Sequence, residues 1–423
     1  MTAIGLRRAR PARLRLVPAV GDRSGADDAP ARAGASGPQR LGLSLVVVVA
    51  VLSLLGSVMI LSASSVWAIE ETGSAFAIFI RQCLWLAISS GALFLGARTD
   101  YHRWARSVPV LVLGAIGLLV LVLVPGVGVS VNGAQRWLGF GAFQIQPAEP
   151  AKFALIVFVA ALVARNGHRV QELGVVLRPA LVVLGMFAVL LMRQPNLGTT
   201  MILCGIVGGM LLWAGIPMRV LAVLGGAAVS LGTVFALSAD YRRERVVGFL
   251  DPWENAGDAG YQTIQSLIGV ASGGVSGTGL GESRAKWGFL PESHTDFVFA
   301  IIGEELGLIG CLCVVALFAA LIGLGLRIAQ RASDPFGAML AVGVTTWFAA
   351  QGFVNVGAVL SLLPITGVPL PFVSFGGSSL VATMLAAGVL VNVALQGHEP
   401  HHPVRARIAA RRARNEARAA ARG

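Results

Sequence analysis

The sequence predicts an all-α polytopic membrane protein with about ten transmembrane helices. Of its 423 residues, 55% are hydrophobic and 13% are charged, whereas soluble proteins carry about 25% charged residues. Long apolar runs recur between residues 42 and 396, and most are separated by short polar connections. Basic residues are concentrated at the two ends of the chain. These three observations exclude an ordinary soluble domain and indicate a membrane domain between two basic tails.

Ten apolar runs approach the length of about 20 residues that a helix needs to cross a bilayer. We expect the spans at residues 42–62, 76–97, 107–125, 149–165, 179–195, 198–214, 220–238, 297–327, 337–360 and 378–396. An even number of spans places both ends of the chain on the same side of the membrane.

The charges at the two ends predict that this side is the cytoplasm. Residues 1–40 carry eight Arg and three Asp, and residues 401–423 carry seven Arg and one Glu. Basic segments beside spans favour the cytoplasmic face and its anionic lipid. We therefore predict a disordered basic tail at 1–40, a membrane domain at 41–396 and a second basic cytoplasmic tail at 397–423. No folded basic module accompanies the tails, so nucleic-acid binding is not expected.

The same orientation places one unusually long segment, residues 239–296, outside the cell between the seventh and eighth spans. It is much longer than an ordinary connection, and it contains Trp, Tyr, Gly and charges of both signs. We expect this large extracytoplasmic loop to be structured. Its Gly-rich part, 273–283, lacks the Gly-Lys-Ser/Thr ending of a phosphate loop, so it does not indicate a nucleotide site.

Asp296, at the end of that loop, is the strongest candidate for a catalytic residue. It lies where a polar stretch meets a long apolar run, so it is either a base at the mouth of an outward-facing site or an acid at a helix N-terminus. Glu304 and Glu305 follow about two turns deeper. On an ideal helix they are rotated by about 80° and about 180° from Asp296, so at most one shares its face.

Cations near the outer face run against the usual distribution of charge in membrane proteins. Arg136, Lys152 and Lys286 fall at or near this face, where they could bind a phosphorylated head group or be ordinary loop charges. Glu149 lies three residues before Lys152 and shares its helix face. The two could form a self-contained ion pair, or line a substrate cleft whose charges neutralise each other when it is empty.

Four other polar or aromatic residues lie near the outer ends of the spans. Trp137 is either an interfacial anchor or part of a head-group site with Arg136. Gln194 precedes Pro195 in a tight turn between two spans. Ser378 and Ser379 open the last span after two glycines, where helix amides could bind an anion or a serine could simply cap the helix.

Eight motifs extend this interpretation along the chain. They are NGAQRWL (132–138), QPAEPAK (146–152), RQPNLGT (193–199), FLDPW (249–253), GYQTIQSL (260–267), GTGLG (277–281), LPESHTDFVFAIIGEELG (290–307) and LPITGVPLPFVSFGGSSL (363–380). In type and order they resemble the motifs of the SEDS family (shape, elongation, division and sporulation), most closely its cell-division branch. The resemblance covers residues 41–396 and neither tail.

The resemblance implies a ten-helix fold and a peptidoglycan glycosyltransferase that polymerises lipid II at the outer face of the bacterial cytoplasmic membrane, at the division septum. The catalytic Asp of the family falls on Asp296, its Arg-Trp pair on Arg136 and Trp137, and its Glu and Lys on Glu149 and Lys152. Implied partners are the lipid II substrate, membrane lipid, a class B penicillin-binding transpeptidase and other membrane proteins of the division complex.

The chain departs from the family pattern at five positions, one of which is a small change, Phe375 in place of a common Tyr. Ala148 and Pro150 replace a usual Ser and Leu, and Asn196 replaces a usual Asp, so an acid there is not essential. Some members have Lys where this chain has Thr366. Lys286 or an arginine could take over any cationic role of that position.

The implied reaction needs one base, because a diphosphate leaves without a proton if cations stabilise it. Asp296 would supply that base, and His294 is more readily explained as a structural or head-group contact than as a second base. No cofactor is required; Mg²⁺ or Mn²⁺ could assist the leaving group, although no ligand cluster demands a metal. The alternatives are a lipid II flippase, an elongation-type SEDS polymerase and a scaffold for division proteins.

Overall fold

The structure is a computed structural model that describes residues 37–397, apart from 132–133, 141–142, 170–171, 173, 238–242, 244–247 and 258–259. The predicted tails therefore lie almost entirely outside the described residues, and only 37–40 and 397 of them are included.

A long helix lies at each of the ten expected spans. These helices are α1 (Gly37–Thr72), α2 (Ala77–Arg98), α4 (Val108–Leu121), α5 (Ala148–Arg165), α6 (Leu177–Arg193), α7 (Leu197–Trp213), α8 (Met218–Leu237), α11 (Val298–Arg331), α12 (Pro335–Val359) and α13 (Gly377–Leu395). Among the described residues, six helices (α1, α2, α8, α11, α12 and α13) are long and apolar enough to cross a membrane, and α4 and α7 are apolar but shorter. The chain is a helical polytopic membrane protein, as predicted; the number of spans stays a prediction.

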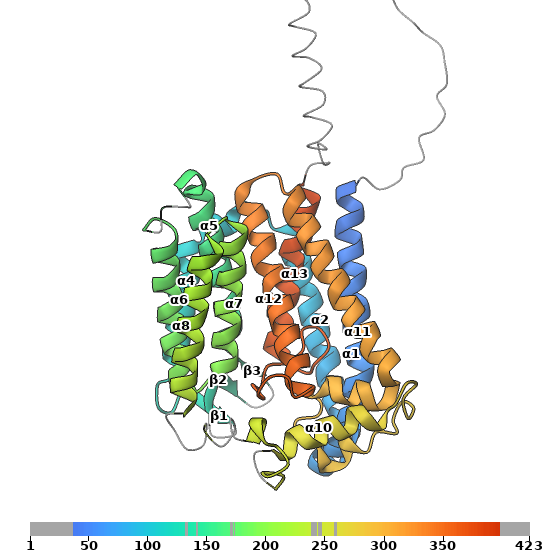
Figure 1. Ribbon diagram of the computed structural model, residues 1–423. Coiled ribbons are helices and arrows are strands. Elements are labelled where there is room, and N and C mark those ends of the chain that lie inside the picture. The colour runs from blue at the N-terminus through green and yellow to red at the C-terminus, as the bar shows by residue number, and fades with distance from the viewer. Residues whose placement is uncertain are drawn as a thin grey trace, which may run out of the picture. The chain divides into compact units, whose positions relative to one another are not determined.

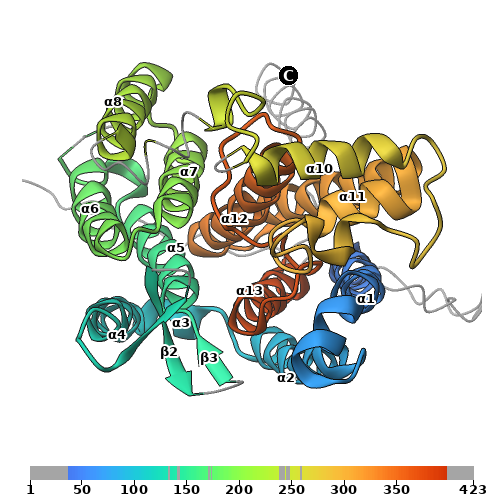
Figure 2. The same cartoon turned by 90° about the horizontal axis from the view of Figure 1, so that it is seen from below.

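The helices form a bundle (Figures 1 and 2). Most residues of α5, α12 and α13 are buried, while the stretch Met218–Phe235 of α8 contains no buried residue. Glycines allow the helices to approach closely, as is common in membranes. A Cβ atom at Gly96 of α2 would lie 2.6 Å from the Leu385 carbonyl oxygen, and one at Gly388 of α13 would clash with the Leu93 carbonyl. Close α2–α13 packing therefore depends on these two glycines.

The first turn of α1 and the last turn of α13 lie at one end of the bundle, opposite α10 and the strands (Figure 1). Short elements connect helices at the end where α1 begins, namely α3 (His102–Arg106) and a 3-10 turn at Gly167–Arg169. This arrangement agrees with an even number of crossings.

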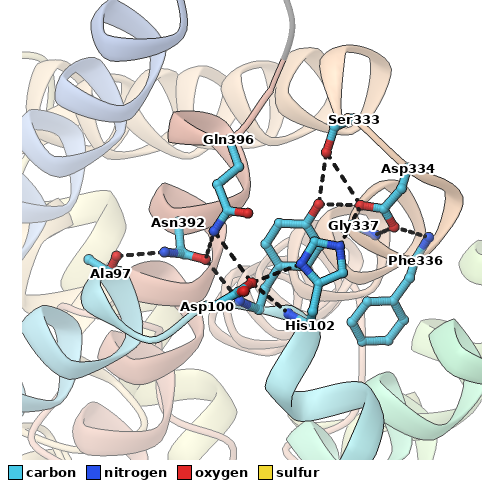
Figure 3. A network of polar contacts seen from close by, with 10 residues as sticks. Ala97, Asp100, His102, Ser333, Asp334, Phe336, Gly337, Asn392 and Gln396 are labelled. Atoms are coloured by element: carbon cyan, nitrogen blue, oxygen red, sulfur yellow. Dashed lines mark hydrogen bonds and ion pairs between the residues drawn. The ribbon is translucent and has the colours of Figure 1, made fainter.

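A polar network ties α2, α12 and α13 together at this end (Figure 3). The Asn392 amide donates to the Ala97 carbonyl oxygen at 2.8 Å and accepts from the Tyr101 amide at 3.0 Å. Asp334 caps α12 by accepting from the amides of Phe336 and Gly337 at 2.8 and 3.0 Å. The network fixes how the ends of three helices meet.

The hydroxyl of Tyr101 completes this network by donating to Asp334. Burial, followed by that hydrogen bond, raises the pKa of Tyr101 to about 12. Burial acts to raise the pKa of Asp334 too, but the bond from Tyr101 and those from the helix amides outweigh it and lower the pKa. His102 lies between two acids, at 2.8 Å from Asp100 and 3.3 Å from Asp334.

A small antiparallel sheet, which the sequence did not predict, lies at the opposite end. It consists of β1 (Gly128–Val131), β2 (Ala134–Phe140) and β3 (Phe143–Ile145) in the order β1-β2-β3. Val129 pairs with Trp137, and Leu138 pairs with Ile145. The strands are only three to seven residues long, so their period-two pattern is too short to stand out beside the apolar runs.

The described parts of 239–296, which follow α8 and precede α11 in the chain, include a helix and a short helical turn; the extracytoplasmic position of this loop stays a prediction. Helix α10 (Tyr261–Ser272) lies across α11 and α12 (Figure 2). The Ser266 hydroxyl of α10 donates to the carbonyl oxygen of Val359 at 2.9 Å. A short π-helical turn, η2 (Ala285–Phe289), follows α10.

The segment between α12 and α13, residues 361–376, is irregular, and its second half, 368–374, is mostly buried. Val373 is fully buried within it. A Cβ atom at Gly56 of α1 would lie 2.5 Å from the Val373 carbonyl oxygen, so this segment packs directly on α1. Irregular backbone inside a membrane protein is tolerated where protein surrounds it or where it lines a polar cavity.

Candidate functional site

Asp296 lies at the end of a tight turn that leads into α11. Glu292 adopts a left-handed backbone conformation (φ 57°), and its carbonyl oxygen accepts from the amides of Thr295 and Asp296, both at 3.1 Å. Phe297, the next residue, is the N-cap of α11 and makes no side-chain cap. Asp296 is thus held just outside the helix by the turn, and its side chain is partly exposed.

The carboxylate of Asp296 faces Gly367, in the irregular segment between α12 and α13. A Cβ atom at Gly367 would lie 3.4 Å from Asp296 Oδ2. Gly367 has a φ of 69°, which favours glycine, so this close approach depends on both the space and the backbone conformation at that position. The residue before it is Thr366, where some family members have Lys.

Two polar side chains of α12 hold the main chain around this site. Asn355 donates to the carbonyl oxygens of Asp296 and Val368 at 2.7 and 2.8 Å. Gln351 donates to the carbonyl oxygen of Pro369 at 2.8 Å. Both residues are buried, and they lie one helical turn apart on the same face.

Glu149 and Lys152, the predicted pair on α5, are buried and bonded to each other. The Lys152 ammonium lies 2.8 Å from Glu149 Oε1 and 2.8 Å from Gln351 Oε1. It also lies 4.7 Å from the ring centroid of Trp347. Lys152 therefore reaches α12, and through Gln351 it is linked to the segment that faces Asp296.

His294 stacks within the site instead of pointing into water. Its ring lies 5.3 Å from that of Trp67 and 5.8 Å from that of Phe375, between centroids. Its carbonyl oxygen accepts from the Phe375 amide at 3.0 Å. Burial lowers the pKa of His294, and the nearby charge of Glu292 opposes this shift only in part. These contacts hold the His294 ring between α1 and the segment before α13; its role as a structural or head-group contact stays a prediction.

Arg136 and Trp137 lie on β2. The Arg136 guanidinium donates to the carbonyl oxygen of Gln194 at 3.0 Å and to that of Pro195. The Gln194 amide donates in turn to the Leu119 carbonyl oxygen at 3.0 Å. Arg136 thus fastens the sheet to the turn between α6 and α7.

Ser378 and Ser379 lie in the first turn of α13, as expected, and both are buried. The hydroxyl of Ser378 accepts from the Gln146 amide at 3.1 Å, which joins α13 to the residues before α5. Lys286 lies in η2, and its ammonium donates to the Gly281 carbonyl oxygen. The Ser378 hydroxyl and the Lys286 ammonium thus both have partners within the protein.

Glu304 and Glu305 hold the outer loop onto α11. Glu304 accepts from the Ser283 hydroxyl at 2.5 Å and from the Arg284 amide at 2.8 Å. Glu305 accepts from the Ser62 hydroxyl of α1 at 2.5 Å. Their carbonyl oxygens accept from backbone amides of the 277–281 motif, at the point where Gly307 (φ 67°) interrupts α11. Both side chains therefore help to hold the outer loop and α1 against α11.

Among the described residues, several buried polar side-chain atoms lack a hydrogen-bond partner, and five of them belong to elements around this site. They are Glu149 Oε2, Gln194 Oε1, Asn196 Nδ2, Glu305 Oε2 and Asn355 Oδ1. Buried polar atoms without partners are uncommon, and they mark places where water or a polar ligand can bind. The described residues contain no cluster of three or more His, Cys, Asp or Glu side chains that could hold a metal ion.

The structure thus connects three of the predicted groups through residues that sequence reasoning missed. Asp296 and Lys152 are linked through Asn355 and Gln351, and His294 is held by Trp67 and Phe375. The missed signal was present in α12, since polar Gln and Asn four residues apart in an apolar helix mark an interior face.

Comparison with known proteins identifies the family. The FtsW/RodA/SpoVE family model, described as "Cell cycle protein", matches residues 43–399. The chain belongs to the SEDS family. The match spans all the long helices except the first turns of α1, so the family fold accounts for the bundle described above.

Similar SEDS proteins cover most of the chain. The "Probable peptidoglycan glycosyltransferase FtsW" of Geobacter metallireducens is 39% identical over 84% of this chain and 95% of its own length. The "Stage V sporulation protein E" of Bacillus subtilis is 41% identical over 83% of this chain and 96% of its own. The chain is therefore an FtsW-like member of the family.

Solved SEDS structures share the fold. A chain from a peptidoglycan synthase complex, described as coordinating polymerization and crosslinking, superposes with a TM-score of 0.69 at 30% identity, over 85% of this chain and 98% of that one. The rod shape determining protein RodA of Thermus thermophilus gives a TM-score of 0.62 at 28% identity, over 84% and 97%.

Proposed function

We propose that this protein is a peptidoglycan glycosyltransferase that polymerises lipid II into glycan strands at the outer face of the cytoplasmic membrane, with Asp296 as general base. The observation that carries the assignment is the position of the Asp296 carboxylate. It is partly exposed, it faces Gly367, and its backbone is bonded to α12. The names of the FtsW relatives support the activity.

In this mechanism the 4-hydroxyl of an acceptor sugar attacks C1 of a donor sugar linked to lipid diphosphate. The new C1–O4 bond forms as the bond from C1 to the diphosphate oxygen breaks, and the hydroxyl proton passes to Asp296. Direct displacement inverts the configuration at C1. The diphosphate leaves as an anion without a proton, so one base is sufficient.

Binding of the diphosphate needs positive charge or hydrogen-bond donors near the leaving oxygen. Arg136, which lies on β2, is one candidate to bind the diphosphate. Lys286 and the first turn of α13 at Ser378 are further candidates. Each is engaged in the described structure, so substrate binding would have to exchange or supplement these bonds. Mg²⁺ or Mn²⁺ bound at the diphosphate would add positive charge beside the leaving oxygen.

The proposed setting is the bacterial division septum, with both termini in the cytoplasm. The Arg residues at the end of the bundle where α1 begins, including Arg98, Arg106 and Arg331, support this orientation. The match to a chain of a peptidoglycan synthase complex supports a class B penicillin-binding transpeptidase as partner. Identity of 39–41% to FtsW and SpoVE relatives, against 28% to RodA of Thermus thermophilus, supports a division or sporulation type over an elongation type.

A lipid II flippase is the second candidate, because polar groups inside the bundle such as Lys152 and Glu149 are also typical of transporters. The two activities are separable in liposomes that contain the purified protein and dye-labelled lipid II. A polymerase converts externally added lipid II into glycan strands, and a flippase moves the label across the bilayer without forming polymer. Polymer formation that requires Asp296 would support the polymerase.

A further inference from the structure

We propose that Asn355 is a positioning residue that sets the Asp296 carboxylate against Gly367. This inference rests on the proposed function, because it assigns a role in the same reaction. Asn355 does not carry charge and need not touch the substrate. Its side-chain amide bonds two carbonyl oxygens that belong to segments 59 and 13 residues away in sequence.

The orientation of the Asn355 amide is fixed by its partners. Both neighbours of Nδ2 are carbonyl oxygens, at 2.7 and 2.8 Å, and only the nitrogen can donate to them. Asn355 is 2% exposed, and its Oδ1 atom has no hydrogen-bond partner among the described residues. A buried acceptor without a partner lowers the stability of the fold. The side chain therefore stabilises the site only through the two bonds that its nitrogen donates.

These two bonds join the two sides of the candidate site. One holds the carbonyl of Asp296 itself, and the other holds that of Val368, the residue after Gly367. The segment before α13 and the turn before α11 are thus fixed to the same nitrogen atom. The contact between the Asp296 carboxylate and Gly367 is therefore set by a residue on a third element, the rigid and buried helix α12.

Gln351 extends this arrangement by one helical turn. It donates to the carbonyl oxygen of Pro369 and accepts from Lys152 and from the indole nitrogen of Trp347, at 2.7–2.8 Å. Consecutive carbonyls, those of Val368 and Pro369, are thus held by residues four apart on α12. The register between this segment and α12 is fixed at two points, which one hydrogen bond alone could not achieve.

The test replaces Asn355 by alanine in the full-length protein and measures lipid II polymerisation by gel analysis of labelled glycan strands. A displacement of about 1 Å at a reacting group can reduce the rate by about 100-fold. We expect kcat to fall by about that factor, with KM for lipid II unchanged. Asn355→Asp keeps the shape but removes the donor, so it should show the same loss.

Asn392→Ala is the matched control, since Asn392 is also a buried asparagine that bonds a carbonyl oxygen, but at the other end of the bundle. It should lower thermal stability by a similar amount and leave kcat per folded molecule unchanged. Asn355→Ala protein with a normal kcat, or with a loss that Asn392→Ala reproduces, would overturn the positioning role. Asp296→Asn is measured alongside. If that variant stays active, the base assignment itself fails; if it is inactive while Asn355→Ala is normal, only the positioning role fails.

Discussion

Replacing Lys152 by methionine should destabilise the protein strongly and identify the role of the buried pair on α5. The two side chains are 1% and 3% exposed, and the ammonium lies 2.8 Å from Glu149 Oε1. The change leaves the Glu149 charge buried without its cation, which costs about 3–5 kcal/mol. The double change Glu149→Gln with Lys152→Met removes both charges. It should return stability to within about 1–2 kcal/mol of the native chain, the cost of hydrogen bonds left unmade.

The assay is equilibrium or thermal unfolding of the purified proteins in detergent, with Arg169→Met as control. Arg169 and Glu172 form the same kind of pair three residues apart, but both are about half exposed, so no measurable loss is expected. KM for lipid II, measured on the double variant, tests the alternative role. An unchanged KM is expected if the pair only anchors α12 through Gln351. A single variant as stable as the native chain, or a double variant no better than the single one, would refute the argument.

Three further predictions test other parts of the structure. Gly277→Ala should detach the outer loop from α11 and abolish polymerisation, because φ is 82° at this position and a Cβ atom would clash with the Glu305 carbonyl. Limited proteolysis measures the detachment, and cleavage of the loop no faster than in the native chain would contradict the prediction. Tyr101→Phe, which removes a bond to a carboxylate, should cost about 1.5–3 kcal/mol of unfolding free energy and leave kcat unchanged; a normal melting temperature would count against it. Acidification from about pH 7.5 to about 5.5 should weaken the packing around His294. The pKa of this residue is lowered in the fold, so the unfolded chain binds the proton first, and stability decreases as the pH falls below the ordinary His pKa of about 6.5. The His294→Gln variant should show a flatter dependence of unfolding on pH. Equal slopes for the variant and the native chain would show that other groups cause the dependence.

The long helices were predictable because their signal is strong and local. An apolar run of about 20 residues has the length that a helix needs to cross a bilayer, and every expected run coincides with a helix. The sequence singled out Asp296 because an acid at the start of a long apolar run is unusual, and its catalytic role stays a prediction. The resemblance to SEDS motifs supplied the expected activity, which no pattern of composition or spacing could have done.

The partners of the site residues were not predictable, because they depend on contacts between distant segments. Lys152 and Gln351 are 199 residues apart, and Ser62 and Glu305 are 243 apart. The sequence left open whether Lys152 pairs with Glu149 or serves a substrate; the structure shows the pair and adds Gln351, while substrate contact stays a prediction. The sheet that carries Arg136 was missed because its strands are short.

The most direct test of the central claim is the rate of lipid II polymerisation by Asp296→Asn protein. The variant should be purified with its cognate transpeptidase present and compared with the native protein at equal folded concentration. Loss of a general base reduces a rate by about 100- to 10,000-fold, and asparagine retains nearly the same shape. The account predicts a loss in that range, with lipid II still bound. Glycan strands formed at the native rate would contradict it.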